Sequence, residues 1–429
     1  MLRMSSPPSA SAAPPEAAEV PGLMAALEQV SAGRMLDCVT ELAADRYAGR
    51  RVGTPGGRAA ASWLAGRLRA LGAEVRLDPF DVAEVRELYR TPVLRWSDGR
   101  QTRPLEHRRD FVEHLTSAEL PDPRSAPLVD AGTADLGGCW VLAPAGEWEQ
   151  ACRRAEAGGA LGVLTARGTD DGGWMPKMIA GPARHAVAVI GVRADLHRRL
   201  ADALAANEVT VTASVPLRAV AAGAVNVHGH LPLGQGVRRE GVEQEAAGGP
   251  RVLLTAHFDG VGDDPERRLP AAADNASGVA AVLEAARVLA ATLTVPVDLR
   301  VSFLDAEEAG ARGSAHHAPA VAPDTQVVNL DGAARLHQAA AVEAGGPAHA
   351  LLAVLDRAGR RTGVALRAGA MASDNRRYAA AGLAAIGVGM GMPGYQTPAE
   401  TPDRVEAATL VTAARLLVAT VWLLAGTRP

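Results

Sequence analysis

The sequence predicts an α/β protein whose mixed, largely parallel sheet is flanked by helices, in a chain of two or more domains. The first observation is length, because 429 residues exceed what one ordinary hydrophobic core holds. The second is the alternation of apolar strand-like and helical segments from residue 251 onward, which is typical of buried parallel strands joined by helices. The third is the high density of turn signals between residues 88 and 218.

The N-terminal part is predicted to be a disordered tail followed by helices. Residues 1–20 are rich in Ser, Pro and Ala and lack the apolar segment of a signal peptide, so a cytoplasmic location is expected. Residues 22–74 are predicted to be helical with an interruption at "AGRRVGTPGG". The stretch "LGAEVRLDPFDV" then forms a strand.

The turn-rich segment is predicted to hold strands and helices of its own. Its predicted strands are "GGCWVLAP", "LGVLTA" and "HAVAVIGV", and its predicted helices are "EWEQACRRAEAGGA" and "DLHRRLADALAA". The strand "AVNVHGHLPL" follows it, and residues 233–249 are expected to form an exposed loop because they are rich in Gly and charge.

From residue 251 each predicted strand leads into a helix. The predicted strands are "RVLLTAH", "VDLRVSFL", "TQVVNLD", one near 339–344 and "AAIGV". The predicted helices are "GVAAVLEAARVLA", one near 312–320, "HALLAVLDRAGRR", 373–382 and 404–425.

Composition excludes several classes of function. The 44 basic and 48 acidic residues give a net charge of −4 without long blocks of either sign, which argues against a nucleic-acid partner. Three cysteines without CxxC spacing argue against a disulfide framework or a cysteine zinc site. The most apolar run, Leu416–Ala425, is shorter than the roughly 20 residues that span a bilayer, so a buried C-terminal helix and no membrane partner are expected.

Metal-type ligands stand where the predicted strands end. His257 and Asp259 follow the first strand, Glu307 and Glu308 follow the second, and Asp331 follows the third. Asp274 lies in a loop directly before a helix. Sites form at the carboxyl ends of strands in open α/β sheets, and a lone carboxylate there is usually a helix cap. So many converging carboxylates would repel one another without a cation, so we favour a metal site.

The adjacent pair Glu307 and Glu308 suggests two roles. Neighbouring side chains point in different directions, so one carboxylate can bind the metal while the other faces a water on it. A metal lowers the pKa of its water, and the second carboxylate can accept the proton. Asp259 beside His257 suggests an acidic group that orients a ligand imidazole.

Two histidine pairs lie outside these strand ends. His228 and His230 share one face of a predicted strand, and His316 and His317 are consecutive on a predicted helix. We expect packed or surface positions for the first pair and surface positions for the second.

Taken together, five motifs resemble the co-catalytic zinc aminopeptidases, whose relatives include aminopeptidase Y, carboxypeptidase Q, glutamate carboxypeptidase and glutaminyl cyclase. They are "HFD", "ADNASGVAAVLEAAR", "FLDAEEAGARGS", "VVNLDG" and "YQTPAETPDRV". The segment "GGCWVLAPAGEWEQACRRAEAGGALGVL" looks like the protease-associated domain often inserted in such enzymes. The resemblance implies a catalytic domain at 21–87 and 219–429, with a smaller β-rich protease-associated insert at 88–218.

The resemblance also implies a role for each motif residue. Asp274 would bridge two metal ions, His257 and Asp331 would complete one site, and Glu308 would serve the other. Glu307 would be the general base, and Asp259 would orient His257. The implied cofactor is Zn²⁺.

Two positions depart from the family pattern. Gln396 stands where the family has the last histidine ligand of the second site, and Asn375 replaces another histidine that is not a ligand there. An amide oxygen binds zinc less well than imidazole, so we expect one tight metal and a second that is weak or absent, with Mn²⁺ or Mg²⁺ as substitutes. Asn375 and Tyr395 are predicted to line the substrate pocket.

The sequence therefore favours a metal-dependent exopeptidase, most simply an aminopeptidase that hydrolyses an amide bond of a peptide. One alternative is specialised amide hydrolysis or cyclisation of a small molecule on the same scaffold. Another is a catalytically impaired binding protein. The sequence predicts neither the terminal preference nor the oligomeric state.

Overall fold

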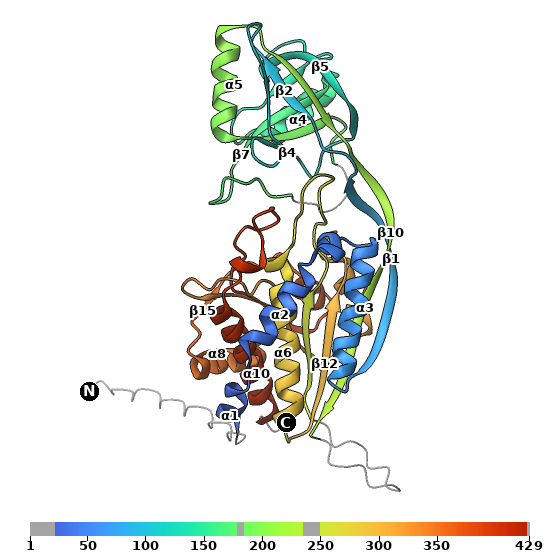
Figure 1. Cartoon of the computed structure of the whole chain (residues 1–429), viewed down its shortest axis with the longest axis vertical. Coiled ribbons are helices and arrows are strands. Elements are labelled where there is room, and N and C mark those ends of the chain that lie inside the picture. The colour runs from blue at the N-terminus through green and yellow to red at the C-terminus, as the bar shows by residue number, and fades with distance from the viewer. Residues whose placement is uncertain (1–21, 178–183, 235–248, 427–429) are drawn as a thin grey trace, which may run out of the picture.

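The computed structural model describes residues 22–177, 184–234 and 249–426. The predicted N-terminal tail and nearly all of the loop expected at 233–249 lie outside these residues. Figure 1 shows two units, each built around one eight-stranded sheet. The main unit consists of the N-terminal helices, β1, β10 and all elements that follow β10 in the chain. The outer unit is the second sheet with its helices, from Leu94 to Val215.

The main sheet is parallel in its centre and has antiparallel pairs on both sides of it. The β11–β12, β11–β13 and β13–β16 pairs are parallel, whereas β10 runs antiparallel to β12 and to β1, and β14 runs antiparallel to β16. In spatial order its strands are β1 (Glu74–Leu88), β10 (Leu217–Leu233), β12 (Val297–Leu304), β11 (Arg251–His257), β13 (Gln326–Leu330), β16 (Ala384–Gly389), β14 (Ala340–Gly345) and β15 (Leu366–Ala368). The predicted mixed, largely parallel sheet is confirmed.

Helices cover both faces of this sheet. Side chains alternate between the faces of a strand, so Leu254 packs into the larger core while Leu253 packs into a smaller one on the other face. The helices that contribute to the larger core are α1 (Leu23–Glu28), α2 (Ala32–Leu42), α3 (Pro55–Ala70), α6 (Ser277–Thr292), α8 (His349–Thr362) and α10 (Ala407–Gly426). Those on the other face are α7 (Arg312–His317), with the short η3 (Ala318–Ala320), and α9 (Asn375–Ala380).

Two helices differ from their predicted bounds for local reasons. The α-helix expected near 312–320 ends at His317 and continues as the tighter turn η3, because the proline at position 319 has no N–H to donate to a carbonyl one turn back. The C-terminal helix begins at Ala407 and not at 404, because the short η4 (Pro402–Arg404) precedes it.

The C-terminal helix α10 is longer than the apolar run identified in the sequence. It has 20 residues and is apolar enough to cross a membrane by length and composition, so the expectation that this segment is too short was wrong. However, 67% of its most apolar window is buried inside the protein. It packs against α6 and α8, as the predicted buried helix would.

The outer unit follows β1 and precedes β10 in the chain. These two long strands pair with each other and run from the main sheet up to the outer unit, as Figure 1 shows. The strands of the outer sheet, in spatial order, are β3 (Thr102–Pro104), β2 (Leu94–Ser97), β9 (Thr210–Val215), β5 (Leu120–Asp130), β6 (Trp140–Leu142), β7 (Gly162–Arg167), β8 (Ala188–Arg193) and β4 (Phe111–Glu113). Helices α4 (Trp148–Ala157) and α5 (Ala194–Ala206) pack against it.

One histidine from each pair meets the other between β10 and α7. The rings of His228 on β10 and His317 on α7 lie 4.1 Å apart between centroids. His317 Nδ1 lies 2.9 Å from the hydroxyl of the buried Tyr378, so the surface position expected for His317 was wrong, whereas His316 is exposed. The helical turn from residue 312 to 317 folds one histidine of the pair inward.

Candidate metal centre

The predicted ligands meet at one edge of the main sheet. The strands β11, β12 and β13 are parallel, so their carboxyl ends lie side by side. His257 is the last residue of β11, Glu307 and Glu308 follow β12, and Asp331 follows β13. Asp274 comes from the short turn η2 (Ala272–Ala276) that leads into α6.

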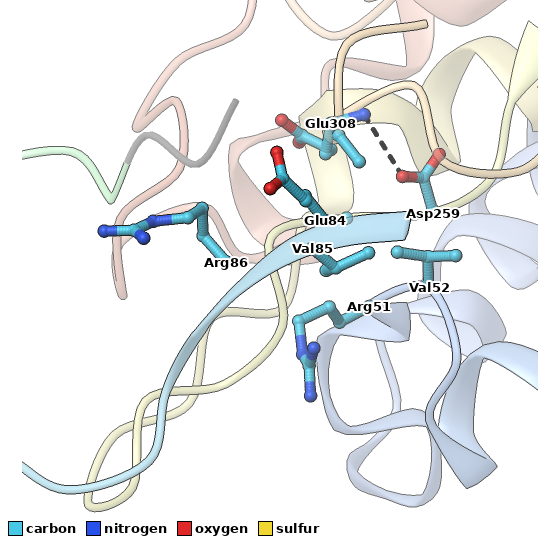
Figure 2. A pocket seen from close by; sticks show the side chains of 9 residues that line it. Arg51, Val52, Glu84, Val85, Arg86, Asp259 and Glu308 are labelled. Atoms are coloured by element: carbon cyan, nitrogen blue, oxygen red, sulfur yellow. Dashed lines mark hydrogen bonds between the residues drawn. The ribbon is translucent and has the colours of Figure 1, made fainter. Parts of the chain in front are cut away.

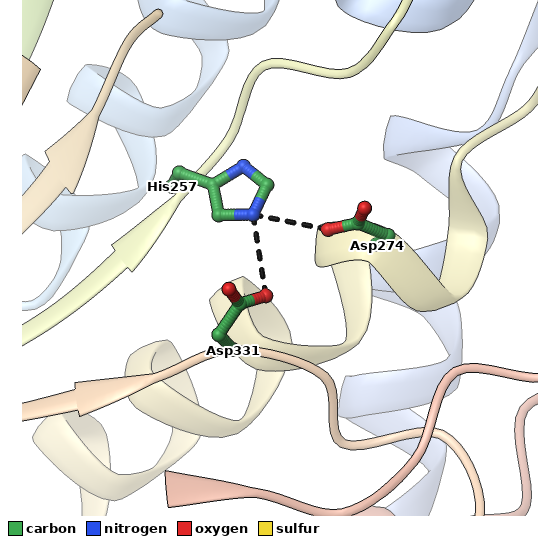
Figure 3. Close-up of side chains that lie close together, drawn as sticks. All are labelled: His257, Asp274 and Asp331. Atoms are coloured by element: carbon green, nitrogen blue, oxygen red, sulfur yellow. Dashed lines mark hydrogen bonds and ion pairs between the residues drawn. The ribbon is translucent and has the colours of Figure 1, made fainter. Parts of the chain in front are cut away.

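Three of these side chains form a tight cluster (Figure 3). His257 Nε2 lies 3.0 Å from Asp274 Oδ1 and 3.3 Å from Asp331 Oδ1. All three residues are buried, and within the described ranges they are the one set of three or more potential ligands whose atoms lie within 4.8 Å of one another. Ligand atoms around one tetrahedral zinc lie about 3.3 Å apart when each is about 2.0–2.1 Å from the ion. The cluster therefore has the spacing of a single ion's ligands.

The electrostatics of the cluster call for a positive charge. Burial alone would lower the pKa of His257, but the carboxylates of Asp331, Asp259 and Asp274 raise it well above its ordinary value. Burial raises the pKa of Asp274, and the negative charge of Asp331 adds to this effect. A divalent cation would relieve the same repulsion and let both carboxylates stay ionised.

Asp259 holds both the imidazole of His257 and the backbone of Glu307 and Glu308 in position. Its Oδ1 lies 3.4 Å from His257 Nδ1, and its carboxylate accepts the backbone N–H groups of Glu307 (3.0 Å) and Glu308 (3.2 Å). Held at Nδ1, the ring presents Nε2 to Asp274 and Asp331.

Behind Asp259 and Glu308 the protein leaves little space. Figure 2 shows these two residues against Glu84 and Val85 of β1, with the Glu308–Asp259 hydrogen bond drawn. The enclosed volume is about 10 Å³. That is room for one water at most, so no substrate approaches from this side.

Glu307 has the environment of a proton acceptor. Burial raises its pKa well above the ordinary value, and the negative charges of Asp331, Asp374 and Asp274 act in the same direction. A general base works best when its pKa is near the working pH, and the direction of this shift is the required one.

Gln396 reaches the cluster through Glu308. Its Nε2 donates to Glu308 Oε2 at 2.6 Å, and both side chains are buried. Among the residues that the structure describes, the amide oxygen of Gln396 and Oε1 of Glu308 are buried and have no hydrogen-bond partner. Two such oxygens are suitable ligands for a cation that binds oxygen, so this half of the site also accommodates a metal. However, the amide N–H of Gln396 already donates a hydrogen bond to Glu308.

The backbone of Gln396 is held from two sides. Its φ of 53° lies in the left-handed region, which costs energy for a residue other than glycine. Its N–H donates to Glu400 Oε2 (2.6 Å), and its carbonyl accepts the N–H of Lys177 (2.9 Å). Glu400 also accepts the N–H of Asp274 through Oε1 at 2.5 Å, so one buried carboxylate ties the Gln396 loop to the metal cluster.

Lys177 belongs to a buried ion-pair network that joins the two units. Its Nζ lies 3.3 Å from Asp264 of the main unit, and Asp264 also accepts two hydrogen bonds from Arg108 of the outer unit (2.7 and 3.0 Å). Arg108 in turn donates to Glu113 at 2.5 Å. These four residues are almost fully buried, so the outer unit is fixed beside the Gln396 loop.

The two predicted substrate residues lie in different surroundings. Tyr395 is 37% exposed, and burial together with the carboxylates of Asp274 and Glu308 raises the pKa of its hydroxyl. Asn375 is only 2% exposed, and its Nδ2 donates to Glu343 on β14 at 3.2 Å. The structure therefore places Tyr395 at the site and ties Asn375 to the sheet.

Sequence reasoning missed three buried residues around the site. Glu400 stands in the quoted loop "YQTPAETPDRV", so its acidic character was a usable signal. Burial raises the pKa of Asp374 to about 7, and the residue stands directly before α9. Arg50 is 0% exposed and donates to the carbonyls of Phe258 (2.7 Å) and Ala271 (2.7 Å), a contact across more than 200 residues that no local pattern predicts.

Comparisons with known proteins concern the family of one segment and the fold of the chain. Residues 241–421 match the model of peptidase family M28. The fold is similar to that of an aminopeptidase from Aneurinibacillus sp. strain AM-1, with a TM-score of 0.71 and 22% identity over 94% of this chain and 96% of that chain. It is also similar to BSAP, a zinc aminopeptidase from Bacillus subtilis (0.68, 21%, 92% and 95%).

A third solved structure, a peptidase M28 precursor from Shewanella amazonensis SB2B, has a TM-score of 0.69 at 17% identity over 95% of this chain and 96% of that one. Coverage of this extent means that the shared fold includes both sheets. No curated protein sequence matches the chain.

Proposed function

Because residues 241–421 match the model of peptidase family M28, we propose that this protein is a zinc-dependent aminopeptidase with one tight metal site and a second, weakened one. The observation that carries the proposal is the buried cluster of His257, Asp274 and Asp331 beside Glu307. The similarity of the fold to that of a zinc aminopeptidase supports zinc as the ion.

The residues divide the work of hydrolysis between them. His257, Asp274 and Asp331 would hold the tight ion, which would polarise the scissile carbonyl and lower the pKa of water at the site. Glu307 takes a proton from the attacking water and returns it to the leaving amine. Asp259 keeps His257 and the backbone of Glu307 in place, so it acts as a positioning residue.

The second half of the site would involve Glu308 and Gln396. A histidine at position 396 would offer an imidazole nitrogen, whereas the glutamine donates its N–H to Glu308 and competes with any ion there. We therefore propose that a second ion binds weakly and exchanges easily, and that Mn²⁺ or Mg²⁺ tolerates the amide oxygen better than Zn²⁺ does.

The same substitution supports a second candidate function, specialised amide hydrolysis or cyclisation of a small molecule. Only one half of the site keeps a full ligand set, and chemistry on this scaffold depends on the site and not on the fold. Turnover of a small amide without any turnover of peptide substrates would favour it.

The direct test is hydrolysis of aminoacyl-nitroanilides by zinc-loaded protein and by Glu307→Gln. We expect release of nitroaniline by the wild type and a loss of about 100- to 10,000-fold in kcat for the variant, with zinc content unchanged. Glu149→Gln, an exposed glutamate on α4, is the matched control and should retain full activity. Equal activity of Glu307→Gln and wild type would contradict the proposed base.

A further inference from the structure

A cavity of about 440 Å³ opens where the outer unit meets the main unit. Residues 167–171 and Pro176 line it from the outer unit, and residues 392–395 with Arg335, His337 and Arg404 line it from the main unit. Its volume is in the range of small-molecule binding sites, which is roughly 300–1,000 Å³.

One end of the cavity is formed by the loop that carries Gln396, whose side chain donates to Glu308 of the candidate metal centre. Tyr395 lines the cavity and directly precedes Gln396, and the carboxylates of Asp274 and Glu308 act on its hydroxyl. The centre holds several buried carboxylates, so this end carries negative potential. A substrate amine is attracted to it.

The remaining wall carries three arginines. Arg167 is the last residue of β7, Arg335 pairs with Glu406 at 2.9 Å with both side chains about half exposed, and Arg404 ends η4. Within the described residues Arg404 is half-buried and has no hydrogen bond or ion pair from its guanidinium. A half-buried guanidinium of this kind is suited to a carboxylate, which it can bind through two parallel N–H donors.

Two carboxylates also line the cavity, and neither removes this bias. Asp170 accepts the N–H of Trp174 (2.8 Å) and lies 3.4 Å from the hydroxyl of Thr397, so its oxygens are occupied by hydrogen bonds. Asp171 is exposed, so solvent and salt screen its charge.

From this polarity we infer that the cavity selects short peptides with a free C-terminal carboxylate, which Arg404 binds with help from Arg167 and Arg335. The inference rests on the proposed peptidase function. A di- or tripeptide is a zwitterion whose amine fits the carboxylate end of the cavity and whose carboxylate fits the arginine wall. Substrate length is limited because each extended residue adds only about 3.3–3.6 Å.

The outer unit takes part in this selection. It supplies Arg167, and the buried Arg108–Asp264 pair fixes it against the main unit. The arginine wall is therefore complete only when the two units are joined, which gives the outer unit a supporting role in specificity.

The test compares a dipeptide, its C-terminal amide and the matching aminoacyl-nitroanilide as substrates of zinc-loaded protein. We expect the free acid to be preferred over the amide by about tenfold in kcat/KM, mainly through KM, because the bond involves two charged groups. Arg404→Gln should bring the two substrates to near equality, and Arg404→Lys should restore part of the preference. Arg360→Gln, an exposed arginine on α8, is the control and should keep the wild-type ratio.

The nitroanilide separates this inference from the function on which it rests. It has no carboxylate, so Arg404→Gln should hydrolyse it at the wild-type rate, which also shows that the variant is folded. Equal use of acid and amide by the wild type, or an unchanged preference in both Arg404→Gln and Arg335→Gln, overturns the cavity assignment alone. If no substrate, the nitroanilide included, is hydrolysed, the peptidase proposal itself fails.

Discussion

The two halves of the candidate metal centre differ in the groups that lie next to their buried carboxylates. In the first half His257 lies between two carboxylates, 3.0 Å from Asp274 and 3.3 Å from Asp331. In the second half Glu308 meets the neutral amide of Gln396 at 2.6 Å, and one oxygen of each side chain is left without a partner. An imidazole and two carboxylates form a zinc site, whereas an amide and a carboxylate satisfy each other only in part.

The difference lies in the side chains and not in the backbone that carries them. The backbone of the Gln396 loop is fixed by Glu400 and Lys177, independently of its side chain. A substitution at position 396 therefore changes ligand chemistry and leaves the loop in place.

The largest effect is expected in the first half. Asp274→Asn removes one negative ligand from the tight cluster, so we expect bound zinc to fall from about one ion per chain to none and peptidase activity to fall by more than about 1,000-fold. Elemental analysis and nitroanilide hydrolysis measure both. Asp324→Asn, which changes an exposed aspartate paired with Arg251, should alter neither. Full zinc content in Asp274→Asn would place the ion elsewhere.

The second-largest effect is expected from the buried ion pairs that hold the Gln396 loop in place. Asp264→Ala leaves Arg108 and Lys177 buried without their main partner, which typically costs about 3–5 kcal/mol. Denaturant unfolding should show this loss, whereas Asp356→Ala, half of an exposed pair with Arg360, should cost less than about 1 kcal/mol. In a folded preparation of Asp264→Ala, tight zinc should persist while any second ion is lost. Loss of the tight ion as well would mean that the two halves are not independent.

His228 on β10 and His317 on α7 sharpen the contrast. Burial lowers the pKa of both histidines, and Asp78 is the acidic residue that opposes this effect. Burial, helped by Arg76 and His316 and opposed by Asp78, lowers the pKa of His228 to about 4, and burial with His228 lowers that of His317 to about 3. The unfolded chain, with a pKa near 6.5, binds these protons first, so the free energy of unfolding should decrease as the pH falls from about 6.5 to 4.

The expected loss for His228 is about 2 kcal/mol over that interval. Urea unfolding at a series of pH values measures it, and His228→Gln should flatten the dependence. His349→Gln, at the start of α8 on the surface, should leave it unchanged. An equally steep dependence in His228→Gln would assign the effect to other groups.

The sequence predicted the first half of the site better than its surroundings, for a physical reason. His257, Glu307 and Asp331 follow parallel strands, and the parallel sheet alone brings such positions together. Arg50 and Lys177 reach the site from distant parts of the chain through tertiary packing, so no local pattern marks them. Asn375 was assigned to the pocket from its place in a motif, whereas its hydrogen bond to Glu343 depends on how α9 packs on β14.

The same distinction holds for the fold. Alternating apolar segments were enough to predict the main sheet, but the pairing of β1 with β10 depends on residues about 140 positions apart and was not predicted. The end of α7 could have been predicted from the proline at position 319, because the loss of one backbone N–H donor is a local effect.

The smallest effect, and the most direct comparison of the two halves, is expected from Gln396→His. The substitution replaces an amide donor by an imidazole that can face Glu308, so we expect the zinc content to rise from about one towards two ions per chain and kcat/KM to rise by roughly tenfold. Gln101→His, at an exposed position of the outer unit, controls for adventitious binding by a new histidine. An unchanged metal content in Gln396→His would mean that Glu400 and Lys177 hold position 396 too far from any ion. The weakness of the second half would then come from the backbone of the loop and not from the glutamine.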